Sequence, residues 1–441
     1  MEHAVEDESR RRFLRSAGLG LGTAAGLSVV ASCSPDPVAT PVDLRARAVL
    51  ADLSSSSSAD DNSARITAAL EQGARSGAEV VVPGGVFDHS GFTLPNDGQV
   101  SMRGMGRSAT RLRNRSVAAS ITAHGKPGGP YCPGWSISGL TLDAATDART
   151  VGLDVALSTR FSARDIDIRG HGVGVAHMSS WACQYSDVSV FDCETGWRFP
   201  TTRFTPSSPV TLTNCNSFDN ETAVQVDDAV ESLLWDGGDW SGCTNGIRIL
   251  GNEVRTVRFG GINFERIKNE DVVVGTDTTG PAGVTFSACR FFRTTPGKVS
   301  IRYERGEGLN LTGCRWTNYS TAVEQQDSAG TLLMSGNSTS RVRGLLDRAG
   351  QTIDEGAFVS SAGNDLAQVS LTGTSLFHSV SASEGVQTKF VSGPGRTTVS
   401  DADFRTRPAP GWTAVVENTD DGTLRHAVRG SKGWRTSAAY T

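Results

Sequence analysis

A repeating pattern of short, alternating segments runs from about Trp135 to Asp347 and constrains the fold more than any other feature of the sequence. Each copy has an apolar-alternating segment, a tight turn, a second short segment, a polar loop and a closing Gly-x-apolar-x-apolar stretch. The copies recur about every 20 to 27 residues, a period typical of solenoids, and alternation with a period of two indicates strands. Stacked short strands with a turn at each corner predict an all-β fold, a right-handed parallel β-helix. The apolar pairs that we expect to face the core at the end of each copy are Leu153/Val155, Val173/Val175, Trp197/Phe199, Val224/Val226, Ile247/Ile249, Val272/Val274, Val299/Ile301 and Ala322/Val323.

The composition supports a turn-rich β protein and excludes one class of partner. The chain has 441 residues, enough for a large core, and it contains 50 glycines, whereas only 7% of its residues are aromatic. The formal net charge is −5, and lysine and arginine form no basic block. A nucleic-acid partner is therefore not expected, because nucleic-acid binding depends on clustered positive charge.

The first residues have the features of an export signal. Residues 9–15 are Ser-Arg-Arg-Arg-Phe-Leu-Arg, and a Gly-rich apolar stretch follows from Ala17 to Ala31. This order resembles the twin-arginine export signal of bacteria. Because the apolar stretch is short and interrupted by glycine, it is not expected to span a membrane.

The end of this segment resembles a lipoprotein processing site. Val30-Ala31-Ser32-Cys33 is similar to the lipobox of bacterial lipoproteins. The resemblance assigns residues 1–33 to a signal peptide with a lipobox and implies a lipid on Cys33 that anchors the protein to a membrane. The alternative is ordinary cleavage and release of a secreted protein. Residues 34–59 are rich in Pro and Ser and are predicted to be a tether.

The cysteines are predicted to be small core residues rather than metal ligands. Cys215, Cys289 and Cys314 occupy the same turn position in their copies, and no Cys-x-x-Cys or Cys/His cluster predicts a zinc site. Cys132 and Cys183 both precede a strand and could form a disulfide in an exported protein.

A capping helix is predicted ahead of the first strand. Asp60 to Ser63 form an N-cap cluster, residues 64–72 place apolar side chains on one face, and a Val-Val-Val-Pro-Gly-Gly segment and the Gly104–Gly106 turn follow. Together these features resemble the pectate lyase superfamily, and within it the branch of rhamnogalacturonases, epimerases and phage tailspikes. The resemblance implies a capped β-helix over residues 60–385. It implies no single activity, since this superfamily contains hydrolases, lyases, epimerases and fibre proteins.

The repeat is lost after about Gly385, and residues 386–441 are predicted to form a small C-terminal β module. Alternating segments flank Asp420-Asp421-Gly422. An Asp-Gly pair between alternating segments predicts a hairpin. This module is expected either to cap the solenoid or to contact a carbohydrate or another partner.

The polar loop before each closing segment carries a row of charged side chains. Because neighbouring coils of a β-helix lie about 4.8 Å apart, residues at one pattern position form a column along the axis. An axial row of this kind suits an extended polymer. The loop positions hold Asp143, His171, Asp192, Glu194, Asp219, Glu221, Glu265, Arg266 and Lys268, and the outward positions of the closing strands add Arg198, Gln225 and Arg248.

This row predicts two kinds of catalytic chemistry. Asp192 and Asp219, on adjacent coils, are the candidates for an acid/base pair that hydrolyses a glycoside, with Asp143 and His171 in support. The same carboxylates could instead bind an acidic sugar through Ca²⁺ and abstract a proton from it. No other cofactor or metal is expected. The residues predicted to hold acidic groups of the substrate are Arg198, Arg248, Arg266 and Lys268.

The same residues also have a structural interpretation. Asp in the turns of a β-helix commonly caps strands or bonds to the backbone, and a Gly-His-Gly loop arises easily in a glycine-rich solenoid.

The charged row is similar in part to the active site of polygalacturonases, which carry Asn-Thr-Asp, Asp-Asp, Gly-His-Gly and Arg-Ile-Lys motifs in that order. Residues 170–172 match the third motif, and residues 266–268 match the fourth, a few residues early in their copy. Asp143 lacks a preceding Asn-Thr, and the fitting Asp-Asp, Asp227-Asp228, follows His171 instead of preceding it. The resemblance therefore implies hydrolase activity only in part.

Two functional hypotheses follow. The first is a polysaccharide-active glycoside hydrolase or lyase at the cell surface, favoured by the row of charge. The second is a non-catalytic surface protein that binds glycan or builds a fibre, for instance as a homotrimer, favoured by the altered order of the acidic motifs.

Overall fold

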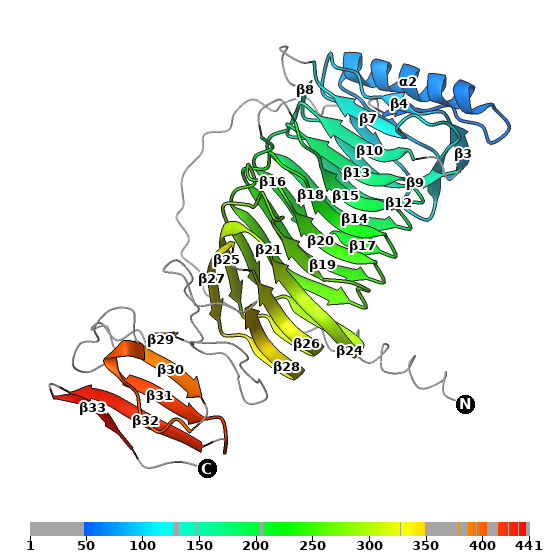
Figure 1. Ribbon diagram of the computed structural model, residues 1–441. Coiled ribbons are helices and arrows are strands. Elements are labelled where there is room, and N and C mark those ends of the chain that lie inside the picture. The colour runs from blue at the N-terminus through cyan, green and yellow to red at the C-terminus, as the bar shows by residue number, and fades with distance from the viewer. Residues whose placement is uncertain are drawn as a thin grey trace, which may run out of the picture. The chain divides into compact units, whose positions relative to one another are not determined.

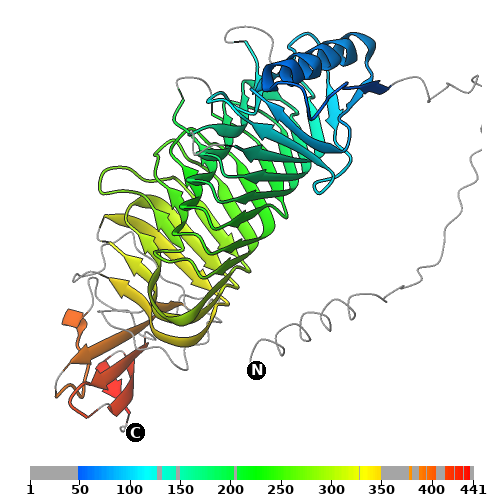
Figure 2. The same ribbon diagram turned by 90° about the vertical axis from the view of Figure 1, so that its right-hand side faces the viewer.

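The computed structural model describes residues 48–126, 132–145, 149–202, 206–326 and 328–348, and further on 377–379, 387–393, 395–403, 413–421, 423–430 and 432–437. The predicted signal peptide, Cys33 and most of the predicted tether lie outside these residues. Residues 48–348 wind into a parallel β-helix, as Figures 1 and 2 show, so the predicted fold is confirmed. None of the described helices is both long and apolar enough to cross a membrane.

The β-helix is one 26-stranded sheet wound into three stacks of parallel strands, which we name A, B and C. Each coil passes through A, then B, then C, and each strand pairs in register with its counterpart in the next coil. Several strands continue through a corner from one stack into the next. The surfaces that the stacks turn outward are named faces A, B and C.

The bounds of the strands follow this order. Stack A contains β1 (Ala48–Leu50), β2 (Glu79–Val81), β5 (Ser101–Arg103), β9 (Ser136–Ala144), β12 (Ser162–Arg169), β14 (Cys183–Phe191), β16 (Val210–Thr213), β19 (Leu233–Ser241), β21 (Val257–Glu265), β23 (Val284–Ser287), β25 (Gly306–Thr312) and β27 (Ala329–Ser335). Stack B contains β3 (Gly85–His89), β6 (Thr110–Asn114), the second parts of β9, β12, β14, β19 and β21, β17 (Asn216–Phe218), and the first parts of β24 (Arg290–Tyr303), β26 (Arg315–Gln325) and β28 (Ser338–Arg348). Stack C contains β4 (Phe92–Thr93), β7 (Ile121–His124), β10 (Val151–Ala156), β13 (Val173–Met178), β15 (Thr195–Phe199), β18 (Thr222–Val226), β20 (Asn245–Ile249), β22 (Val272–Val274) and the last parts of β24, β26 and β28. The short strands β8 (Cys132–Pro133) and β11 (Ser158–Thr159) form a separate pair.

A single residue with positive φ turns the chain at two of the three corners. Glycine, asparagine and aspartate adopt this conformation most readily. The residue that follows each turn points inward, so the corner sets which side chains enter the core. The A–B corner residues are Gly139, Asp165, Asp187, Asn214, Gly237, Gly261, Ala288, Gly313 and Gly336, and the B–C corner residues include Gly170, Asp192, Asp219, Gly242, Arg266, Asn318 and Arg341.

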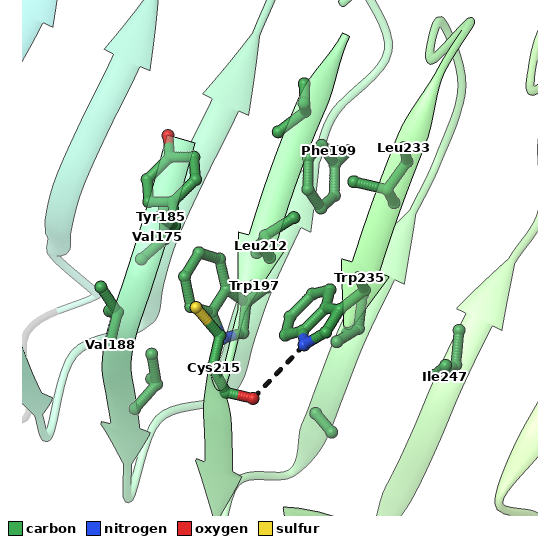
Figure 3. Close-up of a cluster of buried hydrophobic side chains, with 14 of the residues drawn as sticks. Val175, Tyr185, Val188, Trp197, Phe199, Leu212, Cys215, Leu233, Trp235 and Ile247 are labelled. Atoms are coloured by element: carbon green, nitrogen blue, oxygen red, sulfur yellow. Dashed lines mark hydrogen bonds between the residues drawn. The ribbon is translucent and has the colours of Figure 1, made fainter. Parts of the chain in front are cut away.

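Aromatic side chains contact one another, edge to face or stacked, through the middle of the core. The ring centroids of Trp197 and Trp235 lie 5.1 Å apart, and those of Trp235 and Trp240 lie 4.8 Å apart. Figure 3 shows Trp197 and Trp235 packed around Cys215, whose carbonyl oxygen accepts a hydrogen bond of 3.3 Å from Trp235 Nε1. Aromatic contacts of this kind contribute roughly 0.5–1.5 kcal/mol each beyond the area that they bury.

The cysteines of the β-helix are core residues, as predicted from their turn position. Cys215, Cys289 and Cys314 each follow an A–B corner residue and are buried. Burial raises the pKa of the Cys215 thiol to about 12, which keeps it protonated. Cys183 has a free thiol, and the strand of Cys132 pairs with that of Ser158, so the structure does not contain the predicted disulfide.

The predicted core-facing pairs are wrong in two copies. Register shows that the inward residues are Val175 and His177, where Val173 and Val175 were expected. The same shift makes Ile301/Tyr303 the inward pair where Val299/Ile301 was expected. The physical reason is that the second member of each pair is a buried polar residue whose hydrogen bond is satisfied inside the coil. His177 Nδ1 lies 2.7 Å from Tyr185 Oη, and Tyr303 Oη donates to Gly306 O. Ala322 and Val323 are both buried, as predicted, and the next inward residue of that copy is Gln325, whose Nε2 donates to Gly330 O.

Helix α2 (Ala59–Ser76) packs against β1 to β4 at the N-terminal end of the β-helix (Figure 1). Ser58 is the N-cap residue and its Oγ accepts a hydrogen bond from Asp61 N, so the predicted cap cluster lies inside the first turn. The helix continues through Gly73 and ends at Gly77, which has φ 67°. Because β1 precedes the helix, residues 48–58 belong to the fold and not to the tether.

A second sheet is formed near the C-terminus, and it is described by itself. It contains β29 (Phe377–Ser379), β30 (Gln387–Gly393), β31 (Thr413–Asn418), β32 (Thr423–Gly430) and β33 (Gly433–Thr436), and the 3₁₀ turn η2 (Asp401–Asp403) precedes β31. The hairpin predicted at residues 420–422 is confirmed, because Asn418 pairs with Thr423 across it. Since β29 pairs with β30, the strands of this sheet begin before the predicted boundary at residue 386.

A buried polar cluster lies near the C-terminal end of the β-helix. In most coils a glycine begins the stack C strand, because a side chain there would collide with the next coil. Asp271 and Ser300 occupy this position in two successive coils, and Ser300 Oγ donates a 2.7 Å hydrogen bond to Asp271 Oδ2. Burial raises the pKa of Asp271 to about 7, although the nearby Arg293 lowers it. The folded protein therefore holds this proton more tightly than an unfolded chain does.

We expect Asp271→Asn to remove a pH dependence of stability. In the unfolded chain Asp271 loses its proton near its ordinary pKa of 3.8, whereas in the folded protein it does so near pH 7. The free energy of unfolding therefore falls as pH rises between these two values and stays level above them. The total loss is up to about 4 kcal/mol, since each pKa unit corresponds to roughly 1.4 kcal/mol. Urea unfolding from pH 4 to 8 measures the effect, and Asp277→Asn, an exposed aspartate, is the matched control. Parallel stability curves for wild type and Asp271→Asn would contradict this account.

Candidate functional site

Three of the residues predicted for the site are corner residues of the same column. Asp192, Asp219 and Arg266 all have positive φ at the B–C corner, and all three are exposed. The amide of Asp192 donates to Phe218 O at 3.1 Å, and the amide of Asp219 donates to Ser241 O at 3.0 Å, so their coils are adjacent, as predicted. Backbone conformation alone is a sufficient reason for aspartate at these positions.

Two other predicted catalytic residues are buried and already bonded to neighbouring side chains. His171 follows the corner residue Gly170, points inward and is buried, with Nδ1 2.8 Å from Thr150 Oγ1. Burial lowers the pKa of His171 to about 4, so it is neutral near pH 7. Asp143 is 7% exposed and pairs with Arg111 at 2.6 Å. These contacts favour structural roles for both residues.

The predicted binding residues of stack C lie on face C or at the B–C corner. Arg198 pairs with Asp227, with Nε 2.9 Å from Oδ2, and therefore already has an anionic partner. Arg248 lies two coils after Arg198 and is half-buried. Lys268 is exposed at the corner, two residues after Arg266. The structure thus separates Arg198 and Arg248 from Arg266, which turns toward face B.

Face B presents two axial columns of outward side chains. The first, next to the A–B corner, holds Thr141, Asp167, Ser189, Asn216, Asp239, Asn263, Arg290, Arg315 and Ser338. The second, next to the B–C corner, holds Asp143, Arg169, Phe191, Phe218, Ser241, Glu265, Phe292, Thr317 and Ser340. Polar, charged and aromatic residues therefore share one surface along the axis.

A pair of carboxylates, Asp239 and Glu265, lies near the middle of this face. They stand diagonally on the paired strands β19 and β21, since Ser241 pairs with Glu265 and Asp239 pairs with Asn263. The strand spacing and the rise per residue place their Cα atoms about 8 Å apart. Asn263 Nδ2 donates to Asp239 Oδ1 at 3.0 Å, and Asp239 N donates to Asn216 Oδ1 at 2.9 Å. These bonds hold Asp239 between two asparagines of neighbouring coils.

The environment raises the pKa of Asp239 above its ordinary value. Burial is the largest cause, and the negative charge of Glu265 adds to it, while the hydrogen bond from Asn263 and the cations Arg266 and Arg290 act in the opposite direction. Asn263 Oδ1 is buried and accepts no hydrogen bond from the described residues. Burial and a neighbouring negative charge both disfavour the charged form of a carboxyl group, which is the direction of the shift at Asp239.

Two corner residues complete the cluster. Arg266 Nη2 donates to Ser241 Oγ at 2.9 Å, and Arg266 Nε lies 3.7 Å from Glu265 Oε1. Asp219 leans over Gly242, since a Cβ at Gly242 would be only 2.1 Å from Asp219 Oδ1. The Asp219 carboxylate thus fills the space that a side chain at position 242 would need, and glycine lets it lie against the strand of the next coil. We name Asp219, Asp239, Ser241, Glu265 and Arg266 the carboxylate site.

Half-buried phenylalanines lie on both sides of the carboxylate site in the second column. Phe191 and Phe218 stack with ring centroids 5.1 Å apart, and the guanidinium carbon of Arg169 lies 4.0 Å from the centre of the Phe191 ring. On the other side, Phe292 follows Glu265 in the column. Exposed ring edges and faces at these positions offer apolar contacts to an extended ligand. We name Phe191, Phe218 and Phe292 the aromatic flank.

Two hollows of about 570 and 560 Å³ lie elsewhere, on face A. The first is lined by Arg255, Arg258, Thr285 and Asn310 among others, and the second mainly by serine and threonine. Neither hollow contains a carboxylate. They can bind polar groups, but they cannot supply an acid and a base. A third hollow, of about 630 Å³, includes Asp165 and Asp167, but Arg107 pairs with both of these carboxylates and Arg169 pairs with Asp167. The carboxylate site is therefore the better candidate for chemistry.

Asp239 was not among the predicted site residues, because those candidates came from the loops and the closing strands. Asp239 lies on a strand, three residues before the corner residue Gly242, at a position that is Asn216 and Asn263 in the neighbouring copies. Alternation along the second strand of each copy would have shown these residues in one outward column. Among the residues that the structure describes, no group of three or more His, Cys, Asp or Glu is placed to hold a metal ion.

No protein-family model matches this chain, and no curated protein matches it. Solved structures do match. The gp42 tailspike of Acinetobacter phage vb_AbaP_AS12 aligns over 90% of this chain and 82% of its own, with a TM-score of 0.58 and 12% identity. ORF18 of Geobacillus virus E2 aligns over 90% and 77%, with a TM-score of 0.51 and 14% identity.

A third match is the catalytic unit of a GH87 α-1,3-glucanase from Streptomyces thermodiastaticus. It aligns over 76% of this chain and 70% of its own, with a TM-score of 0.51 and 11% identity. At these identities the similarity shows the fold alone. The chain is therefore a parallel β-helix protein of the architecture found in tailspikes and in this glucanase.

We expect Glu265→Gln to lower the pKa of Asp239, because it removes the neighbouring negative charge that helps to raise it. The measurement is a pH titration followed by NMR of protein with ¹³C-labelled aspartate carboxyl groups. Glu231→Gln, an exposed glutamate outside face B, is the matched control and should leave the Asp239 titration unchanged. Identical Asp239 titrations in wild type and Glu265→Gln would show that the two carboxyl groups are not coupled.

Proposed function

We propose that this β-helix protein binds an extended polysaccharide along face B and hydrolyses it at the carboxylate site. The observation that carries the proposal is the diagonal placement of Asp239 and Glu265 on adjacent coils, together with the burial and the neighbouring negative charge that raise the pKa of Asp239. A carboxyl group with a raised pKa suits the role of a general acid. The fold shared with a tailspike and a glucanase supports a polysaccharide ligand.

Binding would use the columns of face B. Sugar rings have apolar faces that pack on aromatic side chains, and the aromatic flank provides such contacts before and after the carboxylate site. Hydroxyl groups of the same chain would bond to the asparagines and serines of the two columns. Because the columns run parallel to the axis, successive sugars of one linear chain would meet successive coils.

Hydrolysis would begin with Asp239 as the general acid. Its proton would pass to the glycosidic oxygen as the bond to the anomeric carbon breaks, and Glu265 would accept a proton from the attacking water. Inversion requires carboxyl groups roughly 6.5–9.5 Å apart, which leaves room for the attacking water, and Cα atoms about 8 Å apart allow the two side chains to reach such a spacing. Arg266, whose Nε lies 3.7 Å from Glu265 Oε1, would orient that carboxylate, and the exposed Asp219 would bind a sugar hydroxyl.

The remaining predicted residues have other proposed roles. Asp192, exposed one coil before Asp219, would contact the glycan without taking part in proton transfer. Elimination with Ca²⁺ stays a second chemistry for the same carboxylates, and it requires an acidic sugar.

We expect Asp239→Asn and Glu265→Gln each to reduce hydrolysis by about 10²- to 10⁴-fold, the usual contribution of general acid–base catalysis. The full-length protein would be tested on a panel of neutral and uronate-containing polysaccharides, with and without Ca²⁺. Reducing-end release and the absorbance of unsaturated uronate would be recorded together. Asp236→Asn is the matched control, because Asp236 lies on the same strand β19 but faces outward from stack A.

Each readout has a distinct meaning. Reducing ends without new absorbance, lost in Asp239→Asn and kept in Asp236→Asn, would support hydrolysis at this site. New absorbance would establish a lyase. Equal activity in Asp239→Asn and wild type would overturn the assignment of Asp239.

A second candidate function is glycan binding without catalysis. It is favoured by the lack of an enclosing pocket, because none of the hollows described above includes Asp239 or Glu265. Binding to polysaccharides from the panel without any cleavage would support this function. A fibre-forming homotrimer would belong to the same alternative.

We also propose that the protein is exported by the twin-arginine route and anchored by a lipid on Cys33. The support is the order of residues 9–15 and the lipobox-like Val30–Cys33 segment. Incorporation of labelled fatty acid into wild type, and its loss in Cys33→Ala, tests this proposal. Release of unlabelled wild-type protein into the medium would instead establish ordinary secretion.

A further inference from the structure

Two arginines of the first column of face B stand side by side beyond the carboxylate site. Arg290 on β24 pairs in register with Arg315 on β26, and both side chains are exposed. Their coils are separated by about 4.8 Å. Like charges on directly neighbouring strand positions repel each other. A negative charge placed near both guanidinium groups would therefore stabilise the pair.

Other arginines near this face have that compensation within the chain. On face B, Arg111 pairs with Asp143, and Arg169 pairs with Asp167 at 2.9 Å. Within the described ranges, neither Arg290 nor Arg315 has a carboxylate at ion-pair distance. An anion from outside the chain would fill this role.

Packing orients the first arginine of the pair. The guanidinium carbon of Arg290 lies 4.8 Å from the centre of the Phe292 ring, a cation–π contact that holds it over the aromatic flank. The guanidinium N–H groups stay free to donate to a carboxylate or a sulfate, which arginine binds with two parallel bonds.

The pair is placed to act on the same ligand as the carboxylate site. Arg290 follows Asn263 in the first column and Phe292 follows Glu265 in the second. Arg290 is therefore one coil from Glu265 and two coils from Asp239, or roughly 5 and 10 Å along the axis. Its charge already reaches Asp239, whose pKa it lowers. A polymer crossing the carboxylate site along the axis would next meet these arginines.

We infer that Arg290 and Arg315 form an anion subsite, and that the polysaccharide bound on face B is acidic. This inference rests on the proposed function and names the substrate class. The recognised group is a carboxylate or a sulfate ester on a sugar located one or two coils beyond the carboxylate site. The arginines bind and orient the chain and take no part in proton transfer.

The test compares binding of three polymers to the full-length protein at several salt concentrations. They are a polyuronate, the same polyuronate with its carboxyl groups reduced to alcohols, and a sulfated neutral glycan. The double variant Arg290→Gln/Arg315→Gln should weaken polyuronate or sulfated-glycan binding roughly tenfold or more, since it removes charge-assisted hydrogen bonds. It should also flatten the salt dependence and leave the reduced polymer unaffected.

The matched control is Arg255→Gln/Arg258→Gln. It removes the same charge from two exposed arginines that line the hollow on face A. An equal loss of binding in both double variants would overturn the subsite, because general electrostatic attraction would then explain it. Wild-type binding of the reduced polymer as tight as that of the polyuronate and the sulfated glycan would overturn it as well.

The polymer preferred by the wild-type protein identifies the anion as carboxylate or sulfate. Thermal unfolding of each variant separates lost binding from lost folding. If the double variant does not fold, Arg315→Gln alone carries the test. A smaller loss of binding, with the same selectivity, is expected from it, and unchanged binding would overturn the subsite.

The failure of this inference differs from the failure of the proposed function. Cleavage that depends on Asp239 but not on the arginines would leave the hydrolase and remove the subsite. Binding that depends on the arginines, without cleavage of any polymer, would leave the subsite and remove the hydrolase.

Discussion

Hydrogen bonds between the strands of successive coils are the interaction on which the rest of this structure depends. They fix the register of each coil on the next, so a residue at one position of the repeat stands directly over its counterpart. Residues with the same role in the repeat therefore line up in columns along the axis. Positive φ forms one column at each tight corner, aromatic rings form another in the core, and the polar residues of face B form two more. A change in one coil is felt first by the residues above and below it.

Register also explains which parts of the fold could be predicted from the sequence. Alternation and the length of the repeat depend only on local sequence, and they identified the strands, their parallel stacking and the capping helix. The small residues at the turn position were correctly placed in the core, as Cys215, Cys289 and Cys314 show. The errors fell where a polar residue is buried. His177 and Tyr303 face inward, and each bonds to a neighbour that no local pattern identifies.

The candidate site was predictable only in part, for a related reason. Asp219 and Arg266 were found because they stand in one polar column, and both belong to the carboxylate site. His171 stands one residue beyond the corner, and a difference of one residue reverses the direction of its side chain. Asp239 escaped notice because its importance comes from Glu265 on the next coil and from partial burial, which are properties of the assembled face. Neither the nearness of Glu265 nor the burial of Asp239 can be recognised in a short stretch of sequence.

The one-residue corners have a consequence for how such a protein can vary. A whole coil can be gained or lost between two corners without changing the direction of any other side chain, because each corner is made by its own residue. The length of face B and the chemistry at its centre are thus separate variables. The exception is the span from Asn216 to Phe292, where the carboxylates and the first arginine come from consecutive coils. An additional coil inside that span would divide the acid from the base, whereas one outside it would only add a rung for a longer sugar chain.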